Sequence, residues 1–210
     1  MTAEAGARRS PDGVAWWRLS ARQAIALAAL CFLAAAGGYA LGTPRRPTEG
    51  SADVGFLRDM IVHHDQAVVM AAIALDKGTE PLVRTFAKEI VILQRYEIGI
   101  MDAYLARWGY ERESGEGTAM AWMGVPVPPD EMPGLASPVQ MGALREAGGR
   151  GADRLFLELM REHHRGGADM AAAAASRARD GRVRDLASAM ARNQRIEINE
   201  MEAARQRLGL

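Results

Sequence analysis

Cysteine is almost missing from this chain of 210 residues, since Cys31 is the only one. A single cysteine excludes a disulfide framework within the chain and a metal site built from thiolates. Lysine is also scarce, and arginine supplies almost all of the positive charge. The 26 acidic and 26 basic residues balance. That balance gives no overall field favouring nucleic acid, so we expect no nucleic-acid partner.

The sequence also lacks the short motifs of several enzyme classes. It contains no phosphate-binding glycine loop, no recognisable nucleophile–base pair and no His-Glu-x-x-His motif of zinc hydrolases. A ferritin-like di-metal oxidase needs Glu-x-x-His on two helices. Here Glu162 directly precedes His163, which is the wrong spacing, and no Glu-x-x-His occurs. We therefore expect no catalytic residues and a protein that is not an enzyme.

The chain does contain an apolar run, Ala24–Leu41, that carries no charge. A basic flank before such a run and small residues at its end are typical of an export signal, and its length is near the ~18-residue minimum for a membrane-spanning helix. We expect residues 1–23 to be a cytoplasmic segment, 24–42 a signal or anchor helix, and 43–52 a linker. A cleaved signal and a retained membrane anchor both stay open, and either places the remainder outside the cytoplasm.

The remainder, 53–210, is predicted to be one helical domain containing an internal repeat. The pairs His63-His64 and His163-His164 are the only histidines, and the surrounding motif repeats at an offset of one hundred residues. Apolar residues recur every three or four positions, as in amphipathic helices. We expect helices over about 53–77, 81–108, 138–147, 153–179 and 182–208.

Two helical hairpins, at about 53–110 and 153–210, and a long crossover at 111–152 predict an all-α, four-helix-bundle fold. The apolar stripe of each hairpin would be exposed to water unless the two hairpins faced each other. We expect no regular structure in the Gly- and Pro-rich part of the crossover, 111–136. Its methionines could form a lid over the bundle or simply pack against it.

Two glutamates fall on the apolar stripes of their helices. Glu97 lies between Leu93 and Met101, and Glu197 holds the corresponding place one hundred residues later. A buried carboxylate is costly unless it is paired or bound to a cation. Counting residues outward from each hairpin loop brings the histidines level with these glutamates and with the glutamines three positions before them.

We therefore predict a polar layer in the bundle centre, bordered by thioethers and able to bind a metal ion. Imidazole suits copper, zinc, iron and nickel, and thioether narrows the choice toward Cu(I), so a copper ion is the expected cofactor. The glutamates would be ligands or would orient the imidazoles. The candidate ligands are His63, His64, His163, His164, Met60, Met70, Met101, Met160, Met170, Met201, Glu97, Glu197, Gln94 and Gln194.

Two other interpretations remain. Each methionine can be an ordinary core residue, and the His-Glu-Gln layer can be a hydrogen-bond network that fixes the packing without metal, in a structural or interaction protein. A ferritin-like di-metal oxidase is less favoured, because only Glu97 and Glu197 lie centrally. The sequence sets no oligomeric state.

These motifs resemble a bacterial family, the domain of unknown function 305. Its pattern, Phe-x-x-x-Met-x-x-His-His-x-x-Ala-x-x-Met-Ala and then Gln-x-x-Glu-Ile-x-x-Met, is matched by Phe56–Ala71 and Gln94–Met101 and again one hundred residues later. The resemblance covers about Ala52 to Leu210. It implies a ferritin-like four-helix bundle, usually exported, some of whose members are associated with copper binding and metal tolerance. Gly166-Gly167 depart from the pattern, and would either loosen their helix or admit a close neighbour.

Overall fold

The computed structural model describes residues 20–42, 46–112 and 117–210. The chain divides into two units, Met1–Arg45 and Arg46–Leu210. Helices make up nearly all of the regular structure in the described ranges, where the only strand-like feature is an isolated bridge between Ala119 and Val127. The predicted all-α class is confirmed. Residues 1–19 of the expected cytoplasmic segment, 1–23, lie outside the described residues.

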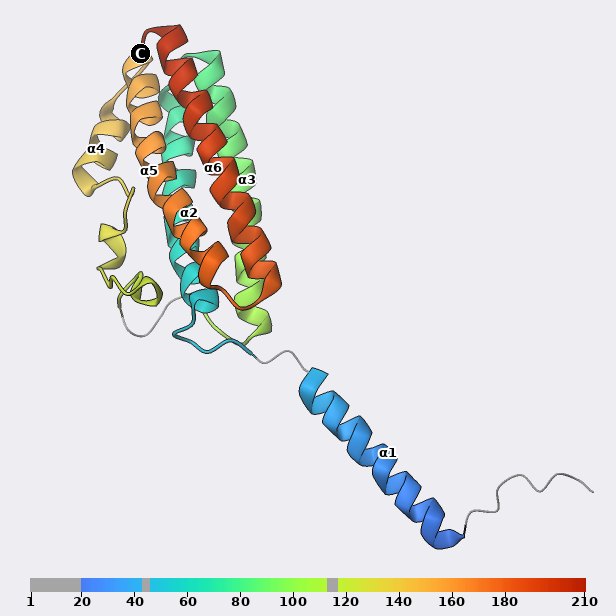
Figure 1. Ribbon diagram of the computed structural model, residues 1–210. Coiled ribbons are helices and arrows are strands. Elements are labelled where there is room, and N and C mark those ends of the chain that lie inside the picture. The colour runs from blue at the N-terminus through green and yellow to red at the C-terminus, as the bar shows by residue number, and fades with distance from the viewer. Residues whose placement is uncertain (1–19, 43–45, 113–116) are drawn as a thin grey trace, which may run out of the picture. The chain divides into compact units, whose positions relative to one another are not determined.

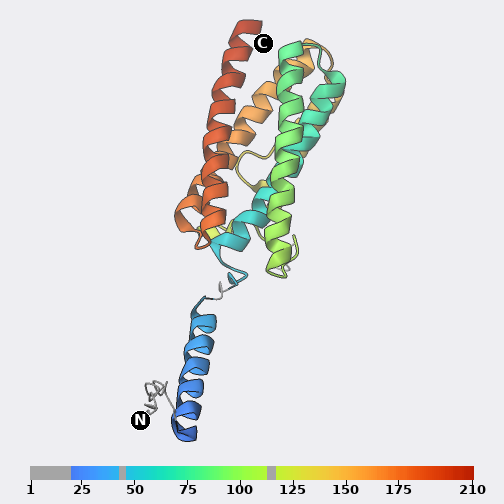
Figure 2. The same ribbon diagram turned by 90° about the vertical axis from the view of Figure 1, so that its right-hand side faces the viewer.

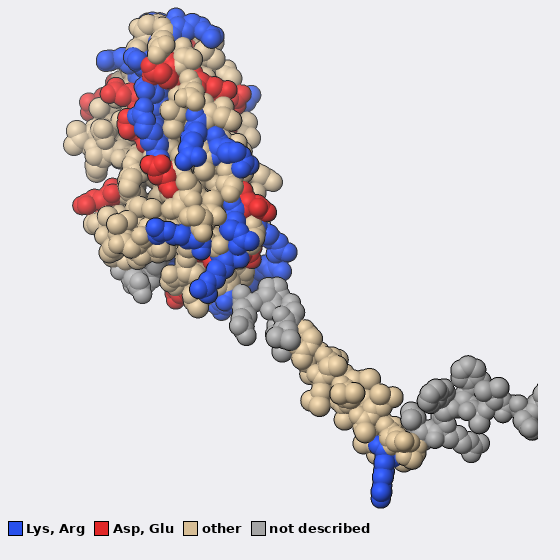
Figure 3. All heavy atoms as spheres, viewed as in Figure 1, with Lys and Arg blue, Asp and Glu red and all other residues tan. Residues whose placement is uncertain are grey.

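The first unit contains helix α1, Ala21–Gly42. Within the described part of the chain it is the one helix long and apolar enough to cross a membrane, and none of the stretch Ala21–Tyr39 is buried. Figure 3 shows its surface as almost wholly uncharged, with a basic side chain only near its start. The helix is consistent with the expected signal or anchor.

The second unit is built around four long helices. These are α2 (Ala52–Lys77), α3 (Pro81–Arg107), α5 (Arg150–Arg177) and α6 (Gly181–Leu208). Helices α2 and α3 form one hairpin, α5 and α6 form another, and α2 packs against α5 between them. Figures 1 and 2 show α3 and α6 on one side of the α2–α5 pair, with the crossover and the short helix α4 (Pro138–Glu146) on the other. The second unit therefore has three layers.

Local sequence signals explain where the helices begin and end. Ser51 caps α2 by accepting the backbone N–H of Val54, and Pro81 occupies the first turn of α3, where a missing N–H costs nothing. Ser137 and Gln140 form a capping box at the start of α4. Gly209, with φ of 63°, ends α6 in the left-handed conformation. The predicted helices agree with the observed bounds to within about three residues.

Two buried aspartates tie the hairpins together, and the sequence reading missed this role for both. Asp153, in the first turn of α5, accepts the backbone N–H groups of Thr79 and Glu80, each at 3.0 Å, at the start of α3. Asp53, in the first turn of α2, accepts those of Arg179 (3.0 Å) and Asp180 (2.8 Å) before α6. Each carboxylate therefore caps a helix of the other hairpin, satisfying N–H groups that a helix start leaves unpaired.

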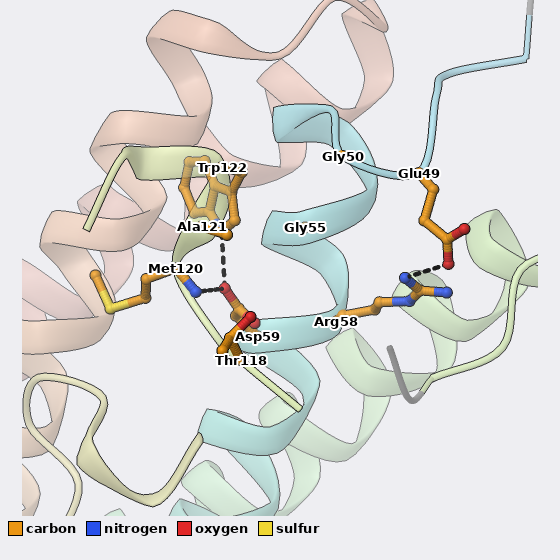
Figure 4. Close-up of a pocket in the computed structure, with 9 residues that line it drawn as sticks. All are labelled: Glu49, Gly50, Gly55, Arg58, Asp59, Thr118, Met120, Ala121 and Trp122. Atoms are coloured by element: carbon orange, nitrogen blue, oxygen red, sulfur yellow. Dashed lines mark hydrogen bonds and ion pairs between the residues drawn. The ribbon is translucent and has the colours of Figure 1, made fainter. Parts of the chain in front are cut away.

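The crossover has more regular structure than predicted. The expectation of none over 111–136 is wrong, because two short 3-10 helices occur, η1 (Ala121–Met123) and η2 (Pro129–Glu131). Asp59 of α2 anchors the segment by accepting the backbone N–H of Met120 (2.8 Å) and the indole N–H of Trp122 (2.7 Å). Figure 4 shows this anchor beside a cavity of about 210 Å³. Met120 has a φ of 60°, so the anchor holds a conformation that non-glycine residues rarely adopt.

Candidate metal centre

All four histidine side chains lie inside the bundle, each exposed by 1% or less. Adjacent residues of a helix point about 100° apart, so each His-His pair faces two directions. His63 and His163 face each other and the crossover, whereas His64 and His164 face the outer helices α3 and α6. We call His63 and His163 the inner pair, and His64 and His164 the outer histidines.

Each outer histidine is bound to a glutamate of its own hairpin. His64 Nε2 lies 2.8 Å from Glu97 Oε2, and His164 Nε2 lies 2.7 Å from Glu197 Oε2. The two carboxylates on the apolar stripes are therefore paired, which offsets the free-energy cost of burying them. They are not equally buried: the Glu97 side chain is 9% exposed and that of Glu197 is 21% exposed. Glu197 is thus less buried than its place on the apolar stripe predicted.

The inner pair forms across the α2–α5 contact. The ring centroids of His63 and His163 are 3.8 Å apart, at an interplanar angle of 38°. His63 Nε2 lies 3.1 Å from the backbone oxygen of Pro133 in the crossover. His163 Nε2 lies 2.8 Å from the backbone oxygen of His63 itself. The crossover thus contributes a group to the polar layer that no spacing rule identified.

Burial keeps the inner imidazoles neutral. It lowers the pKa of His63 to about 3, helped by the nearby His64 and opposed by the bond to Pro133. Burial also lowers the pKa of His163 well below its ordinary value, with His63 and the outer histidines adding to the effect. Loss of hydration disfavours the charged form of an imidazole. A metal ion approaching this pair would therefore meet two neutral rings.

The hydrogen bonds fix which ring nitrogen is available. The Nε2 atoms of His63 and His163 face backbone oxygens, which can only accept, so in these rings Nε2 carries the hydrogen and donates it. In His64 and His164 the same tautomer lets Nε2 donate to the paired carboxylate. The Nδ1 atoms of all four histidines are buried and have no hydrogen-bond partner among the described residues. In a neutral ring such an atom is a lone pair. Metal-binding histidines usually donate their other N–H to a carboxylate or a backbone carbonyl, and all four rings do so here.

The predicted glutamines also lie in this layer. Gln94 and Gln194 are buried, and each has an Oε1 atom without a partner in the described part of the molecule. Gln194 packs directly on Gly167, where a Cβ atom would collide with its amide oxygen. Gly166 similarly faces the backbone of Pro133. Helix α5 continues unbroken through both glycines, so of the two expectations for Gly166-Gly167 the close neighbour is correct.

The methionines divide between the two ends of the bundle. One apolar cluster contains Met60, Met101 and Met170, and the other contains Met70, Met160 and Met201. The six predicted thioethers are thus buried on both sides of the histidine layer, three on each. Met190, Met120 and Met132 join the first cluster and Met141 joins the second. The sequence reading had not counted these four among the ligands.

The predicted ligands do not form one dense cluster of hard ligands. Within the described residues, no three His, Cys, Asp or Glu side chains are grouped so that they could hold a metal ion. A site here would therefore combine one or two imidazoles with thioether sulfur or amide oxygen. Such a donor set suits Cu(I) better than it suits Zn²⁺, which prefers four nitrogen, sulfur-anion or oxygen ligands.

Several solved structures are similar to this chain. A DUF305 protein of Streptomyces coelicolor, named as secreted, is 37% identical, and the match covers 77% of this chain and 96% of that one with a TM-score of 0.72. A DUF305 fragment from Deinococcus radiodurans is 31% identical, with 74% and 96% coverage and a TM-score of 0.64. No curated protein matches the chain.

The protein CopM has a similar structure. Its Cu(I)-bound form is 27% identical, covers 74% of this chain and 96% of its own, and has a TM-score of 0.55. CopM was also solved with Cu(II) and with silver. The model of the domain of unknown function DUF305 matches residues 53–205. This chain therefore belongs to the DUF305 family.

Proposed function

We propose that this protein is an exported metal-binding protein and that its ion is copper, held as Cu(I). The observation that carries the proposal is the set of four buried histidine Nδ1 atoms that have no hydrogen-bond partner within ranges 20–42, 46–112 and 117–210. An unpaired buried polar atom costs free energy, and a bound cation would remove that cost. The copper-bound and silver-bound forms of CopM support the same ion class, since both Cu(I) and Ag(I) are soft.

The predicted ligand residues would have different roles in binding the ion. One or two histidine Nδ1 atoms would bind each ion, and the thioether of Met60 or of Met160, each one turn before a histidine pair, would complete a site. Glu97, Glu197 and the Pro133 carbonyl would orient the imidazoles through Nε2–H. Gln94 and Gln194 would offer amide oxygen. The bound ion would supply binding and storage chemistry, and no catalytic group is assigned.

A structural role is the second candidate, and a specific observation favours it. Both glutamates are paired with a histidine of their own hairpin, which already offsets the cost of burying them. A bundle whose polar layer serves only to fix packing would need no ion. Under this alternative, removing a histidine lowers stability, and adding metal changes nothing. A ferritin-like di-metal oxidase remains disfavoured, because the sequence contains no Glu-x-x-His.

The test is a metal titration of the full chain, purified in detergent and stripped of metal. Cu(I), Ag(I) and Zn(II) are added separately while the melting temperature is followed. An ion that binds only the folded state, at one hundred times its dissociation constant, adds about 2.7 kcal/mol to the free energy of unfolding. We expect Cu(I) and Ag(I) to raise the melting temperature. The His63→Ala/His163→Ala double variant should lose this response.

A matched set of methionine variants separates ligand from core filler. Met→Leu largely conserves volume and costs under about 1.5 kcal/mol. We expect Met60→Leu/Met160→Leu to weaken Cu(I) and Ag(I) binding at least tenfold. Met141→Leu, a buried methionine outside the predicted set, should leave the affinity unchanged. If neither soft ion changes the melting temperature of the wild-type protein, the structural alternative replaces the proposal.

A further inference from the structure

Five residues of the crossover, Met132–Ala136, lie against the inner pair, and we call them the strap. The Pro133 carbonyl accepts the Nε2–H of His63 at 3.1 Å. A Cβ atom on Gly134 would lie 2.8 Å from the His163 backbone oxygen and 3.0 Å from its Cα. The strap therefore contacts the ring of His63 and the backbone of His163.

The strap packs closely on α5 because glycines in this contact have no side chain. A Cβ atom at Gly166 would collide with the Pro133 carbonyl, and a Cβ atom at Gly134 would collide with the backbone oxygen of Glu162. Gly134 also has a φ of 87°, which a side chain would disfavour. Both partners in this contact are glycines, so the strap lies directly on the helix backbone.

Side chains of α2 clamp the crossover on either side of this contact. Gln66 makes two hydrogen bonds to Ala136, accepting its N–H (2.7 Å) and donating to its carbonyl (2.9 Å). Asp59 binds the backbone N–H of Met120 and the indole N–H of Trp122, earlier in the crossover, as Figure 4 shows. The two clamps are seven residues apart, about two turns of α2, and His63 lies between them. Cavities of about 410 and 440 Å³ flank the strap along α2.

We propose that the strap is a gate over the inner pair. In its closed position it orients His63 and shields both rings from solvent. An ion reaches or leaves the Nδ1 atoms of the inner pair only when the strap lifts. The outer histidines lie on the opposite side of α2 and α5 and are not gated. The proposal that the strap controls access of the ion rests on the proposed function. The shielding of His63 from solvent does not.

Two variants open the gate by different means. Gln66→Ala removes the clamp on Ala136, and Gly134→Ala prevents the strap from lying on α5. Gln140→Ala is the matched control, because Gln140 also binds crossover backbone, at Ser137, but lies outside the strap. All are made in the full chain, and circular dichroism and thermal melting establish that each one folds.

The first measurement needs no metal. Diethyl pyrocarbonate acylates accessible neutral imidazole, and peptide mass spectrometry compares His63 with His64, its neighbour on α2. We expect the ratio of His63 to His64 modification to rise about tenfold in Gln66→Ala, which loses two hydrogen bonds. We expect the ratio to rise in Gly134→Ala as well, because the added Cβ atom collides with the backbone of α5. In Gln140→Ala the ratio should equal that of the wild type. An unchanged ratio in both strap variants overturns the gate.

The second measurement follows Cu(I) transfer from a coloured chelator complex by stopped-flow absorbance. The gate predicts faster uptake and faster release in both strap variants, with a smaller change in equilibrium occupancy. Equal rates in all variants overturn the metal-gating role. If the His63 ratio rises but no variant takes up Cu(I), the strap still shields the inner pair, and the proposed function is what fails.

Discussion

At the residue scale, the important groups are the ring nitrogens of the histidines and the carboxylates of the glutamates and aspartates. The sequence predicted that the histidines and glutamates would share one level, and the 2.8 and 2.7 Å histidine–glutamate contacts agree with it. Spacing could not predict the Pro133 contact, because no periodicity places a loop carbonyl against a helix. The aspartates Asp53 and Asp153 could not be predicted either, since each binds N–H groups distant in sequence.

The interhelical aspartates give a prediction about stability. Replacing Asp153 by Ala leaves the N–H groups of Thr79 and Glu80 unpaired at the start of α3. We expect a loss of about 2–3 kcal/mol in the free energy of unfolding, as for charge-assisted bonds at a helix start. Asp169→Ala, an exposed position on the same helix, should change it by less than about 0.5 kcal/mol. Urea unfolding measures both, and equal effects would remove the capping role.

The inner pair predicts a pH dependence in metal-free protein. The pKa of His63 is about 3 in the folded state against 6.5 ordinarily, and that of His163 is also lowered. The unfolded chain therefore binds protons that the folded protein does not. Stability should be complete above about pH 6.5 and fall as the pH drops toward 3, by up to about 1.4 kcal/mol per pH unit for each histidine.

Urea unfolding at pH 7, 6 and 5 checks this dependence. The His63→Gln variant should show about half the slope of the wild type, because one of the two depressed groups is gone. A wild-type stability that does not change between pH 6.5 and 5 would mean that the inner rings are solvated.

At the element scale, the helices follow their sequence signals and the crossover does not. The apolar period of the helices was readable from the sequence, so helix type was predicted correctly and helix bounds to within about three residues. The course of the crossover depends on Asp59 and Gln66 of α2, whose partners lie 61 to 70 residues away. A local sequence pattern gives no information about contacts between residues so far apart. The expectation of no regular structure in the crossover was therefore wrong.

Two glycines in helix interiors give opposite predictions for the same substitution. Gly99 of α3 has nothing within 4 Å of a built Cβ, so Gly99→Ala should stabilise the protein by about 1 kcal/mol through helix propensity. Gly166→Ala gains the same propensity but meets the Pro133 backbone. We expect it to destabilise by at least 1 kcal/mol, as overpacking does. Chemical unfolding compares the two, and stabilisation by both would show that the strap is not seated on α5.

At the scale of the whole molecule, the chain combines an apolar helix with a bundle that has its own cores. Family membership, the all-α class and a relative named as secreted agree with the sequence reading. The ferritin-like assignment, the boundaries of the segments and the ligand set stay predictions. The sequence could not choose between a cleaved signal and a retained anchor, because both need the same apolar run.

The two-unit organisation predicts that the bundle folds without the leader. Residues 46–210, expressed alone, should melt within about 2 °C of the full chain in the same detergent. For a protein of this size 1 kcal/mol shifts the melting temperature by about 2–4 °C, so a larger drop would show that α1 stabilises the bundle. Thermal melting followed by circular dichroism is the measurement.

The question on which the proposed function depends is whether the unpartnered ring nitrogens take the ion. Nitrogen-15 NMR of histidine-labelled, metal-free full chain distinguishes Nδ1 from Nε2 in each ring. Before metal is added, all four rings should carry hydrogen on Nε2. On addition of Ag(I) or Cu(I), the Nδ1 resonances should shift while the Nε2–H signals persist. Spectra that do not respond to either ion, or that respond only at Nε2, would refute the assignment of these nitrogens as metal ligands.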